Sequence, residues 1–473
     1  MVIRSLIDKS TTLKKDNFNN FGLNPICMLS YGPVITRSLI HFDITKLKSM
    51  VDSKCFSDKT KLKHTLCLKN CGNIDKQNKK VPSSNENTCF KERAISFTIL
   101  ALKINKYWDM GVGFDFTEDR WIVGKESLST YASNWYNSTT ETLWDNDGIY
   151  NIDYIKEQYH EYLNSSGVND TIIISTQKFD MGNENLNMDI TDYVNSLLYN
   201  NEDNYGICLM FSPDLEESDC KTTQYVGFFN EKTNTIFTPI LETRYDLDVN
   251  DSRYSFYLNK TNKLYLYSII NDKLENLDEL PNCFINDVEY QVQQETKGIY
   301  YVNVKLYNKD YKPNTILYDL WTNLKYNGEE IEDAEFEFVT LSQKKYFNIN
   351  ETISTPKTLS PFLVGINNNE KINIGEIRLN KLFFRVPYTH SEYLLNNTSE
   401  YRIYTCDGDR EYTIIDWDKL MNVGKHSIFS IDTSTLVPSE YHIDIRVNFG
   451  EELRIFKNET TFKVISNITN QKV

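Results

Sequence analysis

Alternation of apolar and polar residues with a period of two is the feature that most constrains the fold of this 473-residue chain. The alternating runs in its second half are residues 299–306, 335–339, 401–405, 441–448 and 461–465. Residues 254–267 alternate, break at a Lys-Thr-Asn turn and alternate again, which predicts a β-hairpin. Because successive side chains of a strand point to opposite faces, each run predicts a half-buried strand. Short strands separated by turn residues favour β-sandwiches over βαβ units.

Helical patterns are few and short. Apolar residues recur at helical spacing in residues 154–163 and 189–199. Residues 51–93 are rich in Lys, Asn and Cys with little periodicity, so they are interpreted as an insertion between two strands of the first domain. Polar stretches near 246–253 and 342–358 predict two domain boundaries. The expected domains are therefore 1–247, 248–345 and 346–473.

Composition excludes several classes of protein. Lys and Arg number 51 against 66 Asp and Glu, a formal net charge of −15, which argues against sequence-specific nucleic-acid binding. No apolar run approaches the roughly 18 residues that span a bilayer, and residues 1–16 do not resemble a signal peptide. We therefore expect no membrane segment and synthesis in a cytosol. The 31 Tyr and 25 Phe predict β domains with extensive partner contacts.

Nine cysteines form an odd set spread over a long chain, which favours reduced thiols over a disulfide scaffold. Four of them, together with His64, fall in the 51–93 segment and are candidate zinc ligands: Cys55, Cys67, Cys71 and Cys89. Thiolates and imidazole are the usual zinc ligands, and a zinc ion could stabilise a segment that buries little apolar surface. The segment lacks a CxxC pair, so free thiols are the favoured interpretation.

Four tryptophans lie within 37 residues of the first domain: Trp108, Trp121, Trp135 and Trp144. Exposed, they would form an interface or a stacking platform for sugar rings. Buried, they are part of an ordinary sandwich core, which is the expectation for at least two of them.

Catalytic motifs are missing from the sequence. There is no GxSxG elbow, no HExxH and no Gly-rich phosphate loop, and the six histidines form no paired motif. Carboxylates are plentiful, but nothing in the sequence selects a catalytic pair. We therefore expect a non-enzymatic protein without a cofactor.

The first half of the chain resembles the jelly-roll domains of the DNRLRE type. The resemblance rests on an Asn-Phe-Gly-Leu-Asn turn at 20–24 and a strand reading Arg-Ser-Leu-Ile-His-Phe-Asp from Arg37. It also rests on Ile-Thr-Asp-Tyr-Val at 190–194, a Gly-Ile-Cys-Leu strand from Gly206 and a closing strand that begins with Pro239. The resemblance implies a jelly-roll β-sandwich interrupted by the 51–93 segment.

The second half resembles two Ig-like sandwiches. Residues 429–465 match the end of such a domain, with a Leu-x-Pro-x-x-Tyr corner that places Tyr441 as a tyrosine corner. The expected fold class is therefore all-β, a jelly-roll β-sandwich followed by two Ig-like β-sandwiches.

A jelly roll followed by Ig-like modules, with Asn- and Tyr-rich composition, is similar to virion structural proteins of crAss-like short-tailed phages. That resemblance implies a tail ring, barrel or collar component located in the virion. Its partners would be further copies of itself and other tail- or portal-side virion proteins, and its role would be genome delivery. The alternative is a carbohydrate- or receptor-binding fibre or adhesin module.

Overall fold

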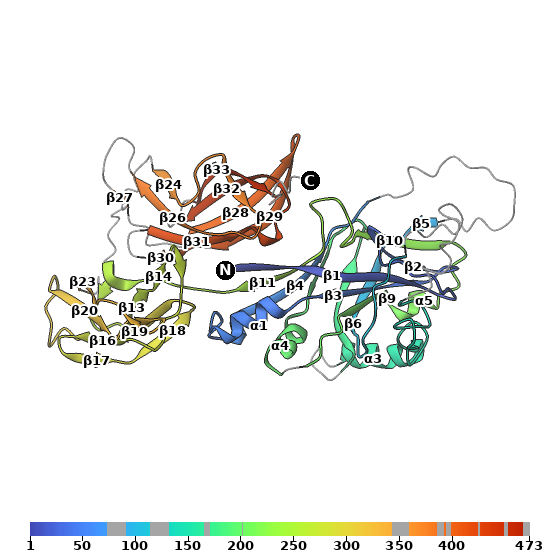
Figure 1. Cartoon of the computed structure of the whole chain (residues 1–473), viewed down its shortest axis with the longest axis horizontal. Coiled ribbons are helices and arrows are strands. Elements are labelled where there is room, and N and C mark those ends of the chain that lie inside the picture. The colour runs from blue at the N-terminus through green and yellow to red at the C-terminus, as the bar shows by residue number, and fades with distance from the viewer. Residues whose placement is uncertain are drawn as a thin grey trace, which may run out of the picture. The chain divides into compact units, whose positions relative to one another are not determined.

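The chain forms two compact units in a computed structural model (Figure 1). The structure describes residues 1–72, 91–113, 132–164, 171–200, 202–342, 359–385, 392–393, 399–423, 426–448 and 453–466. The jelly-roll unit comprises Ile3–Lys48 and Lys63–Arg244. The tandem-sandwich unit comprises Met1–Val2, Ser49–Leu62 and Tyr245–Val473. Both units consist chiefly of β-strands, so the all-β sandwich fold class is confirmed.

The jelly-roll unit is built on one hydrogen-bonded network of 11 strands. The strands are β1 (Val2–Lys14), β2 (Ile26–Tyr31), β3 (Thr36–Phe42), β4 (Leu62–Leu68), β5 (Lys91–Arg93), β6 (Phe97–Lys103), β7 (Ile173–Phe179), β8 (Leu186–Asp189), β9 (Ile207–Phe211), β10 (Thr223–Phe229) and β11 (Ile240–Tyr245). Their order is β5-β10-β2-β3-β1-β11-β4-β8, and β9 joins β3 to β6, which in turn pairs with β7. Strand β3 therefore connects the two parts of the network.

The α-helices of the described residues lie within this unit, apart from the second half of α1, which falls in the tandem-sandwich unit. They are α1 (Thr45–Asp52), α3 (Ile152–Asn164), α4 (Thr191–Tyr199) and α5 (Pro213–Glu216). The two helices predicted from periodicity, at 154–163 and 189–199, are confirmed as α3 and α4. Among the described residues, no helix combines the length and the apolar character needed to cross a membrane.

The first sandwich of the tandem-sandwich unit packs two sheets around Trp321, Tyr300 and Phe338. The first sheet has the order β12 (Phe256–Tyr257), β23 (Ala334–Leu341), β20 (Ile316–Thr322), β16 (Asn282–Ile285), β17 (Val288–Tyr290). The second has the order β13 (Asn262–Tyr267), β19 (Ile299–Val304), β18 (Val292–Thr296). This sandwich also contains two short separate hairpins, β14 (Ile269–Ile270) with β15 (Lys273–Leu274) and β21 (Lys325–Tyr326) with β22 (Glu329–Glu330).

The second sandwich packs around Tyr401, Ile443 and Phe462. One sheet has the order β24 (Ser360–Val364), β26 (Ile377–Arg385), β31 (His426–Asp432), β30 (Met421–Val423), with β27 (Glu392–Tyr393) also on β26. The other has the order β25 (Glu370–Asn373), β33 (Leu453–Ile465), β32 (Ser439–Asn448), β28 (Ser399–Asp407), β29 (Arg410–Lys419). The Tyr441 hydroxyl donates to the Val437 carbonyl over 2.7 Å, so the predicted tyrosine corner is confirmed.

The five alternating runs of the second half are confirmed as β19, β23, β28, β32 and β33. The hairpin predicted at 254–267 is wrong. Its two arms, β12 and β13, belong to different sheets: β12 pairs with β23, and β13 pairs with β19. The break between them lets the chain cross from one layer of the sandwich to the other, and the Asn262 side chain closes that bend by bonding the Tyr257 backbone.

The interpretation of 51–93 as one insertion is also wrong over its first part. Residues 59–61 form a 3-10 turn and residues 62–68 form β4, which pairs with β8. Leu62, His64, Leu66 and Leu68 are buried while the residues between them are not. A histidine at one inward position obscured this alternation in the sequence. Residues 73–90 lie outside the described residues.

Candidate functional site

A pocket of about 780 Å³ opens in the jelly-roll unit beside β3 and α5. Its lining carries charges of both signs, including Lys15, Asp16, Asp147 and Glu217, and it also includes Trp135. Arg37 from β3 and Glu216 from α5 also line it. Their side chains are almost wholly buried, with 4% and 3% exposed.

The Arg37–Glu216 pair is the centre of this region. Arg37 Nη2 lies 2.7 Å from Glu216 Oε2, and Nε bonds the same carboxylate at 3.2 and 3.3 Å. Nη1 donates to the carbonyls of Gly148 at 2.6 Å and Tyr150 at 3.2 Å. Burial alone would lower the pKa of Arg37, but the Glu216 carboxylate outweighs it and the pKa lies above its ordinary value. Every guanidinium nitrogen is engaged, so this pair fastens β3, α5 and the 148–150 segment together and does not present a free group to a ligand.

The tryptophans do not form an exposed platform. Trp108, Trp135 and Trp144 are 2%, 5% and 6% exposed and belong to one hydrophobic core. The Arg37 guanidinium lies 5.2 Å from the Trp135 ring centre, and a Cβ added to Gly148 would come within 2.6 Å of the same ring. The rings of these three residues therefore offer no open face for a sugar. Trp121 lies outside the described residues.

The structure does not bring the candidate zinc ligands together. Cys55 is buried after α1 in the tandem-sandwich unit, whereas Cys67 on β4 and Cys71 belong to the jelly-roll unit. Burial raises the pKa of Cys67 and of Cys71 to about 11, so both thiols are protonated at neutral pH. Among the described residues no three metal-binding side chains cluster, and Cys89 lies outside them.

His64, which was considered as a fifth zinc ligand, is instead a core residue of β4. Its ring is fully buried and its Nδ1 lies 2.8 Å from Thr243 Oγ1. Burial disfavours the charged imidazolium and lowers the pKa of His64 to about 4, from 6.5. The side chain is therefore neutral at physiological pH.

The lowered pKa of His64 predicts that the jelly-roll unit loses stability in acid. Between pH 6.5 and 4 the unfolded chain takes up a proton on His64 that the folded chain does not. The free energy of unfolding should therefore fall as the pH falls through that window, by about 3 kcal/mol in total, and be unaffected by this group above it. Urea unfolding at a series of pH values, with and without His64→Gln, measures the effect.

The variant should unfold with a shallower pH dependence than the wild type. His160→Gln is the matched control, because His160 lies on the exposed side of α3. Equal pH dependence for all three proteins would contradict the assignment of a neutral buried His64.

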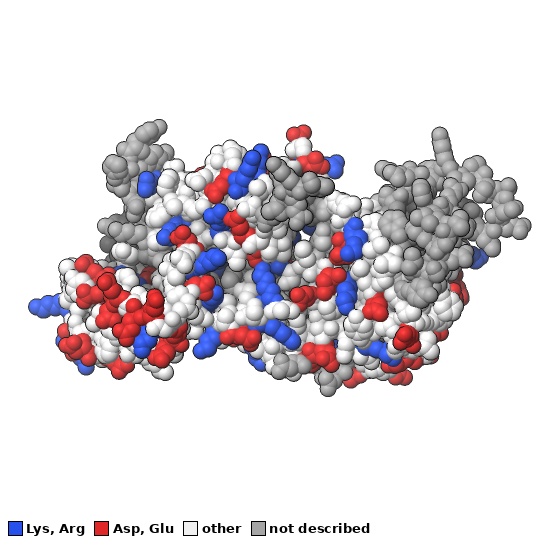
Figure 2. All heavy atoms as spheres, viewed as in Figure 1, with Lys and Arg blue, Asp and Glu red and all other residues white. Residues whose placement is uncertain are grey.

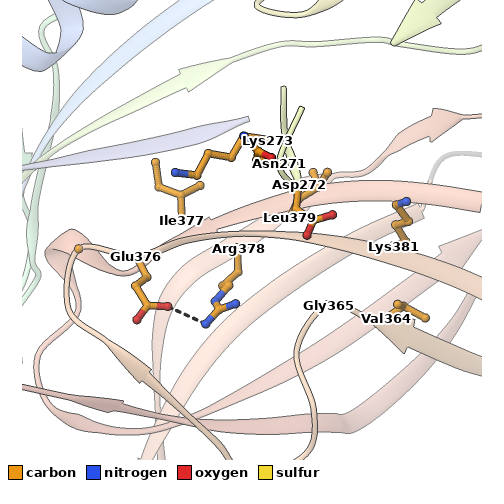
Figure 3. Close-up of a pocket in the computed structure, with 11 residues that line it drawn as sticks. Asn271, Asp272, Lys273, Val364, Gly365, Glu376, Ile377, Arg378, Leu379 and Lys381 are labelled. Atoms are coloured by element: carbon orange, nitrogen blue, oxygen red, sulfur yellow. Dashed lines mark hydrogen bonds and ion pairs between the residues drawn. The ribbon is translucent and has the colours of Figure 1, made fainter. Parts of the chain in front are cut away.

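A second pocket, of about 600 Å³, lies within the tandem-sandwich unit (Figure 3). The β14–β15 hairpin forms one wall through Asp272 and Lys273, and β26 forms another. Arg378 is held by Glu376 at 2.7 Å and by Glu370 at 3.8 Å, and Figure 3 shows the first of these ion pairs. The walls carry both positive and negative side chains, so the charge of the pocket favours neither anionic nor cationic ligands.

Sequence reasoning missed the Arg37–Glu216 pair and the role of His64. Arg37 stands in the strand that carries the family resemblance, but Glu216 lies 179 residues away and no local pattern marks it. The alternation of Leu62, His64, Leu66 and Leu68 was the signal that could have placed His64 inward.

Comparisons with known proteins assign this chain to no family. No protein-family model matches the chain, and no curated protein matches it. Similar solved structures include titin tandem Ig domains, 9% identical, covering 45% of this chain and 91% of that one, with a TM-score of 0.15. The tandem Ig repeats of Dlar are 10% identical, covering 45% and 92%, with a TM-score of 0.14. The Yersinia pseudotuberculosis adhesin InvE is 10% identical, covering 44% and 56%, with a TM-score of 0.16. The class that the observed strands and sheets define is an all-β sandwich protein. Likenesses with TM-scores this low carry no argument about fold or function.

Proposed function

We propose that this chain is a non-enzymatic structural protein of a bacteriophage virion. In the form that the sequence resemblance implies, it is a ring, barrel or collar component of a short tail, made in the host cytoplasm and assembled with other tail proteins for genome delivery. One observation carries the proposal on the structural side. Sheet faces of the tandem-sandwich unit leave large apolar side chains in water, such as Tyr318 and Phe362, each 46% exposed. Large apolar side chains exposed on sheet faces are suited to contact with other proteins.

The jelly-roll pocket supports a structural role in a different way. Its most buried polar groups, Arg37 and Glu216, are fully engaged with each other and with backbone carbonyls. An active site needs groups that remain available to a substrate. In the described pocket, Arg37 and Glu216 instead hold three chain segments together.

The alternative, a carbohydrate- or receptor-binding module, depended on exposed tryptophan rings. Three of the four candidate rings are buried, which removes the described part of that platform. We therefore favour the structural role. A glycan array probed with the full chain distinguishes the two, because the structural role predicts no glycan binding.

The proposal is tested on particles from a culture that produces this chain. Mass spectrometry of density-gradient-purified particles should find the chain in a fixed ratio to tail proteins, and antibodies against it should label the tail in negative-stain images. Recovery of the chain only from cells or medium, absent from purified particles, would overturn the proposal.

A further inference from the structure

One sheet of the first sandwich has an outward face that is apolar along its middle and acidic along both sides. Two successive rows of residues, which lie opposite one another across β17, β16, β20 and β23, form this face. Residues directly opposite on antiparallel strands share a face of the sheet. We call the residues of the two rows the acidic face: Glu289, Phe284, Leu320 and Glu335 in the first row, and Tyr318 and Glu337 in the second.

The acidic face is open to solvent. On β20, Asp319 and Trp321 point into the core and are fully buried, so Tyr318 and Leu320 point outward. Tyr318 is 46% exposed, the three glutamates are exposed, and Leu320 and Phe284 are half-buried. The two middle strands therefore hold an apolar strip that is in contact with solvent.

The negative charge of the acidic face is not balanced within its sheet. None of the five strands β12, β23, β20, β16 and β17 contains a Lys or an Arg. The residues opposite Glu289, Glu335 and Glu337 on the neighbouring strands are all apolar or aromatic. Within the described part of the chain, no cation forms an ion pair with these three carboxylates.

The surroundings of the acidic face carry the same sign of charge. Residues 329–333, which lead into β23, include four exposed carboxylates. Residues 248–342 contain 17 Asp and Glu against nine Lys and Arg, a net charge of −8. Figure 2 shows acidic side chains gathered over this sandwich, where Figure 1 labels β20 and β23. The charge of this face is therefore complementary to a cationic partner.

We propose that the acidic face docks a basic amphipathic helix of another protein. This inference rests on the proposed function, in which another protein of the particle supplies that helix. A basic amphipathic helix carries an apolar stripe with Lys or Arg along both borders. Its stripe packs on Phe284, Leu320 and Tyr318, and its cations meet the glutamates of β17 on one side and of β23 on the other. Recognition of this kind places the apolar side of a helix against an apolar surface of the partner.

The dimensions of the acidic face fit one helix. Neighbouring strands lie about 4.8 Å apart, so the acidic borders on β17 and β23 are about 14 Å apart. A helix with its side chains is about 10–12 Å across, so it can lie between the borders and extend its cations to both. Glu335 and Glu337 are two residues apart on β23, or about 6.8 Å. Residues four apart on a helix are separated by about 6 Å of rise, so two Lys at that spacing can pair with both glutamates.

An extended segment fits the acidic face less well than a helix. Successive side chains of a strand point to opposite sides. An amphipathic strand with its apolar side on Phe284 and Leu320 would therefore point its cations away from the sheet, out of reach of both acidic borders. A helix instead carries cations beside its apolar stripe, at the level of the glutamates.

The test uses the full chain and a fluorescent model peptide of about 18 residues, long enough to form a helix. The peptide contains only Leu and Lys, with the Leu residues in one stripe that Lys borders on both sides. Fluorescence anisotropy measures its binding at low salt and at about 0.5 M salt, where the Debye length falls below about 5 Å. The wild type should bind the peptide, and more weakly in high salt. A peptide of the same composition with the stripe scrambled should bind at least about tenfold more weakly, and so should a peptide with Glu in place of Lys.

Variants of the chain identify the surface that binds. Glu335→Lys with Glu337→Lys should weaken binding of the Leu/Lys peptide at least about tenfold. Tyr318→Ser should weaken it at both salt concentrations, because salt does not screen an apolar contact. Glu141→Lys with Glu157→Lys changes the net charge by the same amount at two exposed positions of the jelly-roll unit. This matched control should bind as the wild type does.

Two further measurements do not depend on a loss of binding. The peptide with Glu in place of Lys should bind the Glu335→Lys, Glu337→Lys variant more tightly than it binds the wild type, a gain that a misfolded variant would not show. A photo-crosslinking group placed in the Leu stripe should attach to β16 or β20 of the wild type.

A wild type that binds the Leu/Lys peptide no better than the scrambled one overturns the inference. So does a control variant that loses as much affinity as the Glu335→Lys, Glu337→Lys variant, or a crosslink outside the acidic face. These outcomes are distinct from failure of the proposed function. A chain that binds the peptide but is absent from particles keeps the docking face and loses the virion role, whereas a chain that is found in particles and does not bind the peptide does the reverse.

Discussion

Replacing Arg37 with Met should lower the free energy of unfolding of the jelly-roll unit by about 3–5 kcal/mol. The substitution keeps an unbranched side chain but leaves the Glu216 carboxylate buried without its cation, and it leaves the carbonyls of Gly148 and Tyr150 without their donor. Urea unfolding followed by tryptophan fluorescence reports on this unit directly, since the Arg37 guanidinium lies over the Trp135 ring.

Two further variants show whether burial of the ion pair is the cause of the destabilisation by Arg37→Met. Lys178→Met removes one partner of the exposed Lys178–Asp180 pair, at 3.1 Å, and should cost less than about 1 kcal/mol. Arg37→Met combined with Glu216→Leu removes both buried charges and should recover much of the loss. If Arg37→Met were no more destabilising than Lys178→Met, the Arg37–Glu216 pair would not hold the three segments together as its geometry indicates.

The strands of the second half could be predicted because each is determined by the alternation of residues within its own short run. A run such as 441–448 places apolar residues on one face by its own alternation, and β32 follows it closely. Which strand a run pairs with depends on residues far along the chain. The arms of the expected hairpin at 254–267 look like neighbours in the sequence, yet β12 and β13 take partners about 80 and 40 residues away, in different sheets.

The candidate site could be predicted only in part, for the same reason. The sequence shows the four tryptophans as a group. Whether each ring packs in the core or is exposed depends on burial, which composition does not specify. Cys55 and Cys67 are separated by 12 positions in the sequence but belong to different units. Neither Glu216, the partner of Arg37, nor Asp319, the distant partner of Arg253, is marked by any local pattern, because these two ion pairs form where distant segments meet.

Arg253 in the first sandwich lies between two buried carboxylates. It forms ion pairs with Asp251 and Asp319, and Asp319 also accepts a bond from Trp321 Nε1 at 2.6 Å. Burial raises the pKa of Asp251 to about 6 and raises that of Asp319, although Arg253 opposes both shifts. The cation is therefore what allows these two carboxylates to remain charged in the core at neutral pH.

Replacing Arg253 with Met should destabilise the first sandwich by about 3–5 kcal/mol at neutral pH, because it leaves two like charges buried without compensation.

This loss of stability should shrink on acidification. Above the ordinary Asp pKa of 3.8 the folded state holds protons on Asp251 that the unfolded state releases, so the free energy of unfolding rises as the pH falls from about 6 towards 3.8. Without Arg253 both carboxylates bind protons more tightly, so this rise should begin at a higher pH and be larger. Urea unfolding between these pH values measures it, and adding Asp251→Asn with Asp319→Asn to the variant should abolish the difference. A variant with the pH dependence of the wild type would mean that Arg253 is not what holds the two carboxylates in their charged form.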